Sequence, residues 1–197
     1  MSAIRKDIND IQTNYYGEYN TVYESLIKKY NYDFLLYDES FFQYDFNESN
    51  GYIRYAFFQF PYDFPTYDNY LLQNGFDINE IGEALRTEYE QEISEANLMN
   101  NVYPIRYEYS IKDYKTLLHP ASHLHIGYHN DIRISSAHII TPLVFTLFVI
   151  KNCYYDLWER QIQSKKLNKF LLPVKMSCHK IPATYFGDKD KYELFLV

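Results

Sequence analysis

The chain contains little cysteine and little glycine, and both shortages exclude classes of protein. Its two cysteines, Cys153 and Cys178, stand among 197 residues without CxxC or any other metal-type spacing. So low a count is typical of a reducing cytosol and excludes a disulfide framework. The six glycines form neither a P-loop nor a GxGxxG segment. Nucleotide binding through either of these motifs is therefore excluded.

Long hydrophobic runs are also missing. The most apolar run, IITPLVFTLFVI at 139–150, is about eight residues shorter than a membrane span. The opening residues, MSAIRKDINDIQ, lack the apolar core of a signal peptide. We therefore expect a cytoplasmic protein that has no membrane partner.

Aromatic residues, by contrast, are abundant, with 23 tyrosines and 14 phenylalanines. A/T-rich codons explain this excess in one way, since the Asn, Ile, Lys and Asp that they also encode are plentiful. An aromatic-rich interface explains it in another, because tyrosine gives large contact area at low rotamer cost. The length predicts a single domain over 1–197, with a helical segment at 1–30 and a body at 31–197.

Charge is distributed unevenly along the chain. The whole carries a net charge of −7, but residues 1–111 hold 7 basic against 19 acidic residues, a net charge of −12. Residues 112–197 hold 12 basic against 7 acidic residues, a net charge of +5, together with all six histidines. The two halves either complement each other within the fold or across a partner, or the positive half faces phosphate.

Hydrophobic periodicity predicts helix first and strands next. Apolar residues at steps of three and four over 4–26 predict an amphipathic helix, or two helices if Gly17 divides it. Aromatic and β-branched residues at 32–46 and 51–60 predict two strands joined by a turn. The segment 61–70, which contains two prolines, is predicted to be a loop.

An acidic helix is predicted over 77–96. Asp77 stands at its expected N-cap and Glu80 three residues later, which is the capping-box pattern. Its glutamates predict a solvated face or a docking face for a basic partner. The apolar stripe expected to be buried comprises Ile78, Ile81, Leu85, Tyr89 and Ile93.

The second half of the chain begins with three predicted strands. Segment 105–111 alternates, with Arg106 and Glu108 on one face and tyrosines on the other. Segments 122–128 and 132–134 follow as two more strands. Their connections are too short for helical crossovers, which predicts antiparallel hairpins.

A helix is then predicted to begin with Thr141 as N-cap and Pro142 at its first position, and to continue through 154–166. Because 143–150 is apolar almost all round, this helix should lie across a sheet face. The predicted fold class is therefore α+β, an antiparallel sheet covered by helices.

Four of the six histidines lie in LLHPASHLHIGYHNDIRI at 117–134. In a strand, residues two apart share a face, so His123 and His125 should point away from the core while Leu124 points into it. His119 flanks this strand, and Arg133 lies on the next one, where it can stand opposite the histidine face.

Three interpretations of this histidine face stay open. An HxH strand with His119 as third ligand can hold zinc or another divalent metal, although no acidic residue has a diagnostic spacing. Histidine with Arg133 can also act on phosphate, but Gly127 replaces the third histidine of the histidine-triad hydrolases, and the repeated HxS/T of two-histidine phosphoesterases is missing. Finally, His123 and His125 can order the sheet or form a protein-binding surface, with no cofactor bound.

Residues 103–160 resemble the bacterial domain-of-unknown-function family 2290. The family has an H-P-x-S-H-L-x-x-G segment, an R-I-P-like segment and a helix that opens with Thr/Ser-Pro and closes on an aromatic pair. Ser135 stands where the family has proline. The resemblance implies a prokaryotic cytosolic protein from a mobile or defence-related gene cluster and assigns no activity. The matching residues are His119, Pro120, Ser122, His123, Leu124, Gly127, Arg133, Ile134, Pro142, Tyr154 and Tyr155.

The first functional hypothesis is a non-enzymatic interaction subunit of a prokaryotic multi-protein assembly with a defence role. Its partners would be proteins encoded nearby or further copies of the chain, bound through aromatic and acidic surfaces. The alternative is a metal- or phosphate-dependent enzyme acting on nucleic acid through His119, His123, His125 and Arg133. Nucleic acid is also a possible partner of the basic half, through Lys165, Lys166 and Lys169.

Overall fold

The computed structural model describes residues 18–47, 51–99, 102–128, 132–165, 167–192 and 195–196. Its backbone contacts divide the chain into two compact units. One unit comprises Met1–Phe41 and Phe58–Val102, and the other comprises Phe42–Phe57 and Tyr103–Val197. The single domain expected over 1–197 stays a prediction.

In the first unit, helix α2 (Tyr19–Lys28) buries one face. Tyr23 packs its ring against Phe41 and Phe60, with centroids 5.4 and 6.0 Å apart. The end of the predicted N-terminal stripe is thereby confirmed, whereas its beginning in residues 1–17 lies outside the described residues. The side chains that α2 buries are Tyr19, Val22, Tyr23 and Leu26.

Two short helices replace the single helix predicted over 77–96. Helix α4 (Ile78–Ile81) begins after Asp77, whose carboxylate accepts a hydrogen bond of 2.8 Å from the backbone N–H of Asn79. The predicted cap is confirmed, but the continuous helix is wrong. Gly82 adopts a φ of 53°, which glycine reaches without a steric penalty, and this ends α4 before α5 (Arg86–Glu95) begins.

A small aromatic core holds these helices together. Helix α3 (Tyr67–Gln73) occupies part of the segment predicted to be a loop, and that prediction is wrong because apolar side chains one turn apart find partners on α5. Ile78 is 39% exposed, so its predicted burial is wrong as well. Strand β1 (Phe34–Leu35) also belongs to this unit. The buried cluster consists of Tyr67, Tyr70, Leu71 and Tyr89.

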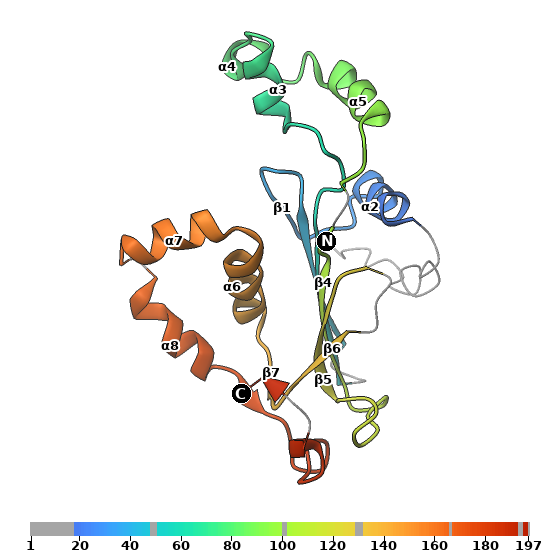
Figure 1. The fold of residues 1–197 in the computed structure, drawn as a ribbon, viewed down its shortest axis with the longest axis vertical. Coiled ribbons are helices and arrows are strands. Elements are labelled where there is room, and N and C mark those ends of the chain that lie inside the picture. Colours follow the sequence, from blue (N-terminus) through green and yellow to red (C-terminus); the bar gives the residue numbers. More distant parts are fainter. Residues whose placement is uncertain are drawn as a thin grey trace, which may run out of the picture. The chain divides into compact units, whose positions relative to one another are not determined.

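The second unit is built on a twisted sheet (Figure 1). Neighbouring strands from β3 to β6 pair antiparallel, and β9 pairs parallel with β6. The predicted antiparallel hairpins between 105 and 134 are confirmed. In spatial order, the strands of this sheet that lie mainly in the second unit are β2 (Phe41–Asn47), β3 (Tyr52–Phe58), β4 (Ile105–Ser110), β5 (Ser122–Ile126), β6 (Arg133–Ser136) and β9 (Phe195–Leu196).

Helix α6 (Pro142–Cys153) covers the aromatic face of this sheet (Figure 1). Thr141 caps it as predicted, because its hydroxyl accepts a hydrogen bond of 3.4 Å from the N–H of Val144. Phe145 is fully buried, and its ring centroid lies 6.3 Å from that of Phe42 and 5.6 Å from that of Tyr55. The α+β fold predicted from the sequence is confirmed.

Two further helices follow α6. Tyr154, with φ −131° and ψ 54°, separates α6 from α7 (Tyr155–Gln163), so the predicted continuous helix is wrong. Helix α8 (Asn168–Met176) contains Pro173, a residue that argues against a helix interior, and the sequence did not predict it. Among the described helices, none combines the length and the apolar composition that crossing a bilayer requires.

A second, two-stranded sheet returns the chain from α8 to the main sheet (Figure 1). Strand β7 (His138–Ile139) pairs antiparallel with β8 (His179–Lys180). The hydroxyl of buried Tyr107 accepts a hydrogen bond of 3.0 Å from the N–H of Ile140, which holds the segment after β7 against β4. A short 3-10 helix, η2 (Asp190–Tyr192), follows β8.

Candidate metal centre

The main sheet has one polar and one apolar face, and β5 contributes to both. Pairing between strands places His123 opposite Glu108 and His125 opposite Arg106. On the other face Leu124 stands opposite Tyr107, and it is 1% exposed. The predicted alternation along this strand is confirmed. The polar face is itself buried, since the exposed fractions of His123 and His125 are 1% and 8%.

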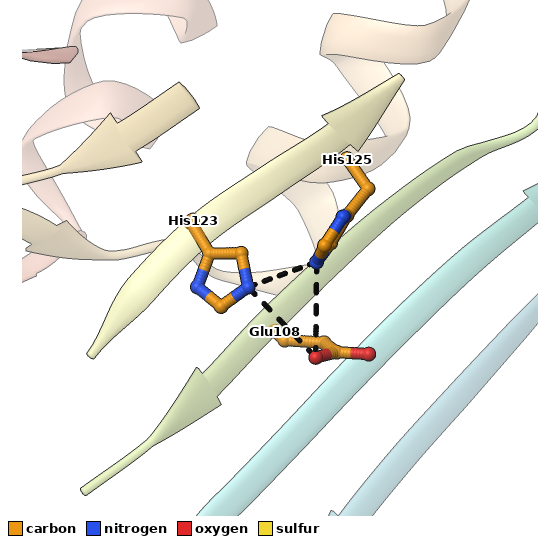
Figure 2. Close-up of side chains that lie close together, drawn as sticks. All are labelled: Glu108, His123 and His125. Atoms are coloured by element: carbon orange, nitrogen blue, oxygen red, sulfur yellow. Dashed lines mark hydrogen bonds and ion pairs between the residues drawn. The ribbon is translucent and has the colours of Figure 1, made fainter. Parts of the chain in front are cut away.

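Three ligand atoms converge on this polar face. The Nε2 atoms of His123 and His125 lie 2.9 Å apart. A carboxylate oxygen of Glu108, Oε2, lies 3.9 Å from the first and 4.0 Å from the second. Figure 2 shows the three side chains pointing toward one another from neighbouring strands, and among the described residues they form a group able to hold a metal ion.

The hydrogen bond of the other ring nitrogen fixes the tautomer of His123. Its Nδ1 lies 3.0 Å from the carbonyl oxygen of Pro120. Because a carbonyl only accepts, Nδ1 carries the proton, and Nε2 of the neutral ring keeps its lone pair. Histidines that bind metals are oriented in this way, with the distal N–H held by a backbone carbonyl or carboxylate. Without a metal, Nε2 of His125 donates to Nε2 of His123.

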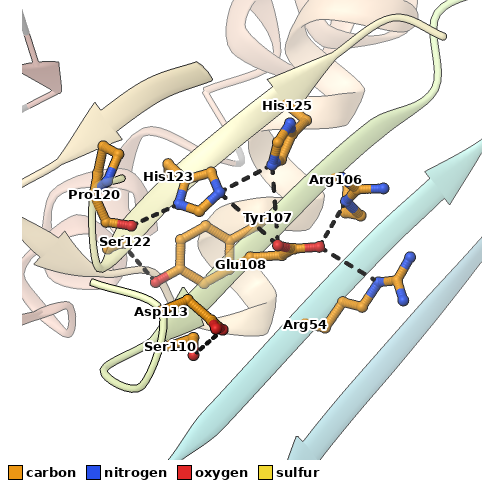
Figure 3. Close-up of polar contacts among 10 residues, drawn as sticks. All are labelled: Arg54, Arg106, Tyr107, Glu108, Ser110, Asp113, Pro120, Ser122, His123 and His125. Carbon is orange, nitrogen blue, oxygen red and sulfur yellow. Dashed lines mark hydrogen bonds and ion pairs between the residues drawn. The ribbon is translucent and has the colours of Figure 1, made fainter. Parts of the chain in front are cut away.

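Two arginines orient the carboxylate of Glu108. Arg106 contacts its Oε1 through Nε at 2.8 Å, and Arg54 approaches the same oxygen at 3.9 Å. Figure 3 shows the guanidinium groups on the side of the carboxylate opposite the imidazoles. This arrangement leaves Oε2 facing the two histidines. Arg54 is buried, with 4% of its surface exposed.

Burial keeps both imidazoles neutral. It is the largest cause that lowers the pKa of His123 to about 4, and the Glu108 carboxylate opposes the shift only in part. Burial is also the largest cause that lowers the pKa of His125 to about 2, and the positive charge of Arg106 is the next largest. At neutral pH both rings are therefore neutral, so metal binding releases no net proton, but His125 has to move its proton from Nε2 to Nδ1 before Nε2 binds the ion.

These shifts predict that acid destabilises the metal-free protein. Between about pH 7 and pH 5.5 we expect each buried histidine to remove about 1 kcal/mol from the free energy of unfolding. In the unfolded chain each ring gains a proton near pH 6.5, whereas in the folded chain it does not. The stability that each neutral, buried histidine contributes is therefore complete above that pH and is lost progressively below it.

Urea titration with a chelator present measures this dependence. The His123→Ala, His125→Ala double variant should lose less stability between the two pH values than the parent chain. An identical pH dependence in both proteins would contradict the prediction.

The separations fit a small transition-metal ion. In tetrahedral zinc sites the donors stand about 2.0–2.1 Å from the ion, and thus about 3.3 Å from one another. The distance between the two Nε2 atoms is 2.9 Å and falls slightly below this value, while those to Glu108 Oε2 are 3.9 and 4.0 Å and exceed it. Small side-chain rotations therefore suffice to bring all three donors to one ion.

The other predicted site residues lie around this centre or apart from it. The ring of His119 stands edge-on to that of His123, with centroids 5.0 Å apart. His119 was the third candidate ligand expected from the sequence, whereas the group found among the described residues contains Glu108 in that role. Arg133 pairs with His125 across β5 and β6. Lys165 is exposed in the turn between α7 and α8, and Lys169 is exposed on α8, while Lys166 lies outside the described residues.

Sequence reasoning missed Glu108 and Arg54. The alternation in IRYEYSI had placed Arg106 and Glu108 on one strand face, but it did not relate that face to the histidines. The signal was the hairpin itself, because antiparallel pairing of 105–110 with 122–126 sets Glu108 opposite His123. Arg54 lies on β3, which is far from β4 in the sequence. No short hairpin turn therefore indicates how these two strands align.

Comparison with known proteins identifies the family. Residues 3–184 match the uncharacterized conserved protein family DUF2290. The chain belongs to this family. The match extends the resemblance seen at 103–160 over both compact units and includes every residue of the candidate metal centre in this DUF2290 member. No curated protein and no solved structure matches the chain.

Proposed function

We propose that the protein is a metal-dependent enzyme acting on a phosphate ester, with zinc or another divalent transition metal held by Glu108, His123 and His125. The convergence of two neutral imidazoles and one carboxylate carries this proposal. Three protein ligands leave a coordination position for water or substrate, as in catalytic zinc sites. A metal bound there would polarise a phosphoryl oxygen and lower the pKa of a bound water.

Charge around the centre supports an anionic substrate. Arg54 and Arg106 contact Glu108, and Arg133 pairs with His125 and is exposed. Arg133 is an exposed guanidinium next to the candidate ligands, and a phosphate group would pair with it. Guanidinium also matches phosphate geometry in bidentate contacts. Arg133, as the exposed member, is the residue that we assign to substrate contact.

The test uses untagged protein, with titration of Zn²⁺ and Mn²⁺ and assay of bis(4-nitrophenyl) phosphate hydrolysis. We expect one metal ion per chain and hydrolysis that requires it. The His123→Ala, His125→Ala double variant should lose both properties. His179→Ala, which removes an exposed histidine on β8, serves as the matched control. Metal binding that is equal in the parent chain and the double variant would rule out the proposed centre.

A second candidate function is an interaction subunit in a cytosolic prokaryotic assembly. The exposed apolar side chains of α8 favour it, since Phe170 is 61% and Leu172 67% exposed, and α8 buries none of its residues. Such an apolar helix surface is typical of a protein contact. Its partner would be a neighbouring gene product or a second copy of the chain.

For this candidate we expect a mass above that of the monomer in size-exclusion chromatography with light scattering, for the chain alone or co-expressed with neighbouring genes. Phe170→Ser with Leu172→Ser should restore the monomer. A parent chain that stays monomeric under both conditions would contradict it.

A further inference from the structure

A cavity of about 750 Å³ lies in the second unit, on the apolar side of the main sheet. Its volume is within the range of small-molecule binding sites, about 300–1,000 Å³. It is bounded by β5, β6, β7, helix α6 and the segment from the end of α8 into β8. The lining residues are Leu124, Ser136, His138, Ile140, Val144, Phe145, Phe148, Lys151, Lys175, Met176, Cys178 and Lys180.

Apolar and charged residues line different parts of this cavity. Leu124 and Phe145, which form its inner wall, are 1% and 0% exposed. Lys151, Lys175 and Lys180, by contrast, are exposed. The interior is therefore hydrophobic, and the positive charges gather where the cavity meets solvent. No acidic residue is among the described residues that line it, so the lysines have no carboxylate partner within the lining.

We propose that this cavity binds an amphiphilic anion, an aliphatic chain with one carboxylate or phosphate head group. The chain would lie against Leu124, Phe145 and the other apolar residues, and burying its methylenes would drive binding. The head group would stay at the opening near the three lysines, whose ammonium groups act as point charges toward any anion.

This site is separate from the candidate metal centre. Leu124 lines the cavity, whereas its neighbours His123 and His125 point to the opposite face of β5. The proposal therefore does not rest on metal binding, and each can fail without the other. Cys178, a free thiol of intermediate exposure, lines the cavity. It provides a chemical reporter of occupancy at this place.

The first experiment measures binding of octanoate, decanoate and dodecanoate to the full chain by calorimetry, below their micellar concentrations. One site per chain is expected, with affinity rising about three- to fourfold for each added methylene that is buried. Monododecyl phosphate should also bind, and comparing its affinity with that of dodecanoate shows which head group is preferred. Dodecyltrimethylammonium, with the same chain and opposite charge, should bind at least about tenfold more weakly.

Variants then locate the charge requirement. Lys151→Ala, Lys175→Ala and Lys180→Ala together should lower the affinity for dodecanoate about tenfold. The matched control replaces Lys112, Lys115 and Lys189 by alanine, since these three are exposed and do not line the cavity. All six positions are exposed, so both triple variants should fold. Circular dichroism verifies this.

Alkylation kinetics locate the ligand itself. At saturating dodecanoate, iodoacetamide labelling of Cys178 should slow at least about tenfold, if the ligand excludes reagent from the cavity. Cys153 is the other cysteine of the chain and is not among the residues that line the cavity, so its rate is the internal reference in the same digest. The proposal is overturned if dodecanoate does not saturate, if the cationic analogue binds equally well, or if Cys178 is not protected.

Discussion

Replacing Glu108 with glutamine is expected to lower the affinity for Zn²⁺ by about 100-fold. Glu108 is the acidic member of the ligand group found among the described residues, and its Oε2 faces both Nε2 atoms at 3.9 and 4.0 Å. Glutamine has the same size but no negative charge. Its carbonyl oxygen can still contact the guanidinium of Arg106, so the hairpin should remain folded.

Competition with a chromophoric chelator measures this loss of affinity directly. Glu88→Gln is the matched control, because Glu88 is exposed on α5 and belongs to the other compact unit. Circular dichroism of the Glu108 variant separates loss of a ligand from loss of the fold. An affinity within about threefold of the parent value, in a folded variant, would show that Glu108 does not bind the metal.

Truncating Phe145 should produce the largest loss of stability. We expect Phe145→Ala to lower the free energy of unfolding by about 3–5 kcal/mol. Phe145 has no exposed surface and packs between α6 and the sheet, with its ring centroid 5.6 Å from that of Tyr55 and 6.3 Å from that of Phe42. Alanine removes these aromatic contacts and enlarges a cavity that already exists beside the ring.

Urea denaturation followed by far-UV circular dichroism gives this free energy. The matched control is Phe170→Ala, which removes the same side chain from a position on α8 that is 61% exposed. This substitution should lower the free energy of unfolding by less than about 0.5 kcal/mol. Equal costs for the two variants would mean that α6 does not anchor this unit.

Local spacing predicted the histidine face but not its partner from β4. The HxH spacing placed His123 and His125 together, because strand periodicity is a property of neighbouring residues. Glu108 and Arg54 required the register of two strand pairs, which depends on how strands separated by loops align. The identity of the third candidate ligand therefore came only with the structure.

Helix boundaries, like the site residues, were predictable only where neighbouring residues determine them. The start of α6 was predictable because Thr141 and Pro142 act within a single turn. The breaks at Gly82 and Tyr154 were not, since glycine is tolerated inside helices and tyrosine carries no stop signal. Helix α8 contains Pro173, so local propensity argued against it.

The alternation along β5 has a consequence for how the gene can change. Inserting one codon between Ser122 and His123, while the following strand pairing is kept, would turn His123 and His125 toward the aromatic side and Leu124 toward the arginines. One such event would abolish both the candidate metal centre and the wall of the cavity. Changes of length should cost less in the segment between Lys112 and Leu118, which lies outside the strands of the main sheet, although Tyr114 and Leu117 hydrogen-bond to Asp190 there.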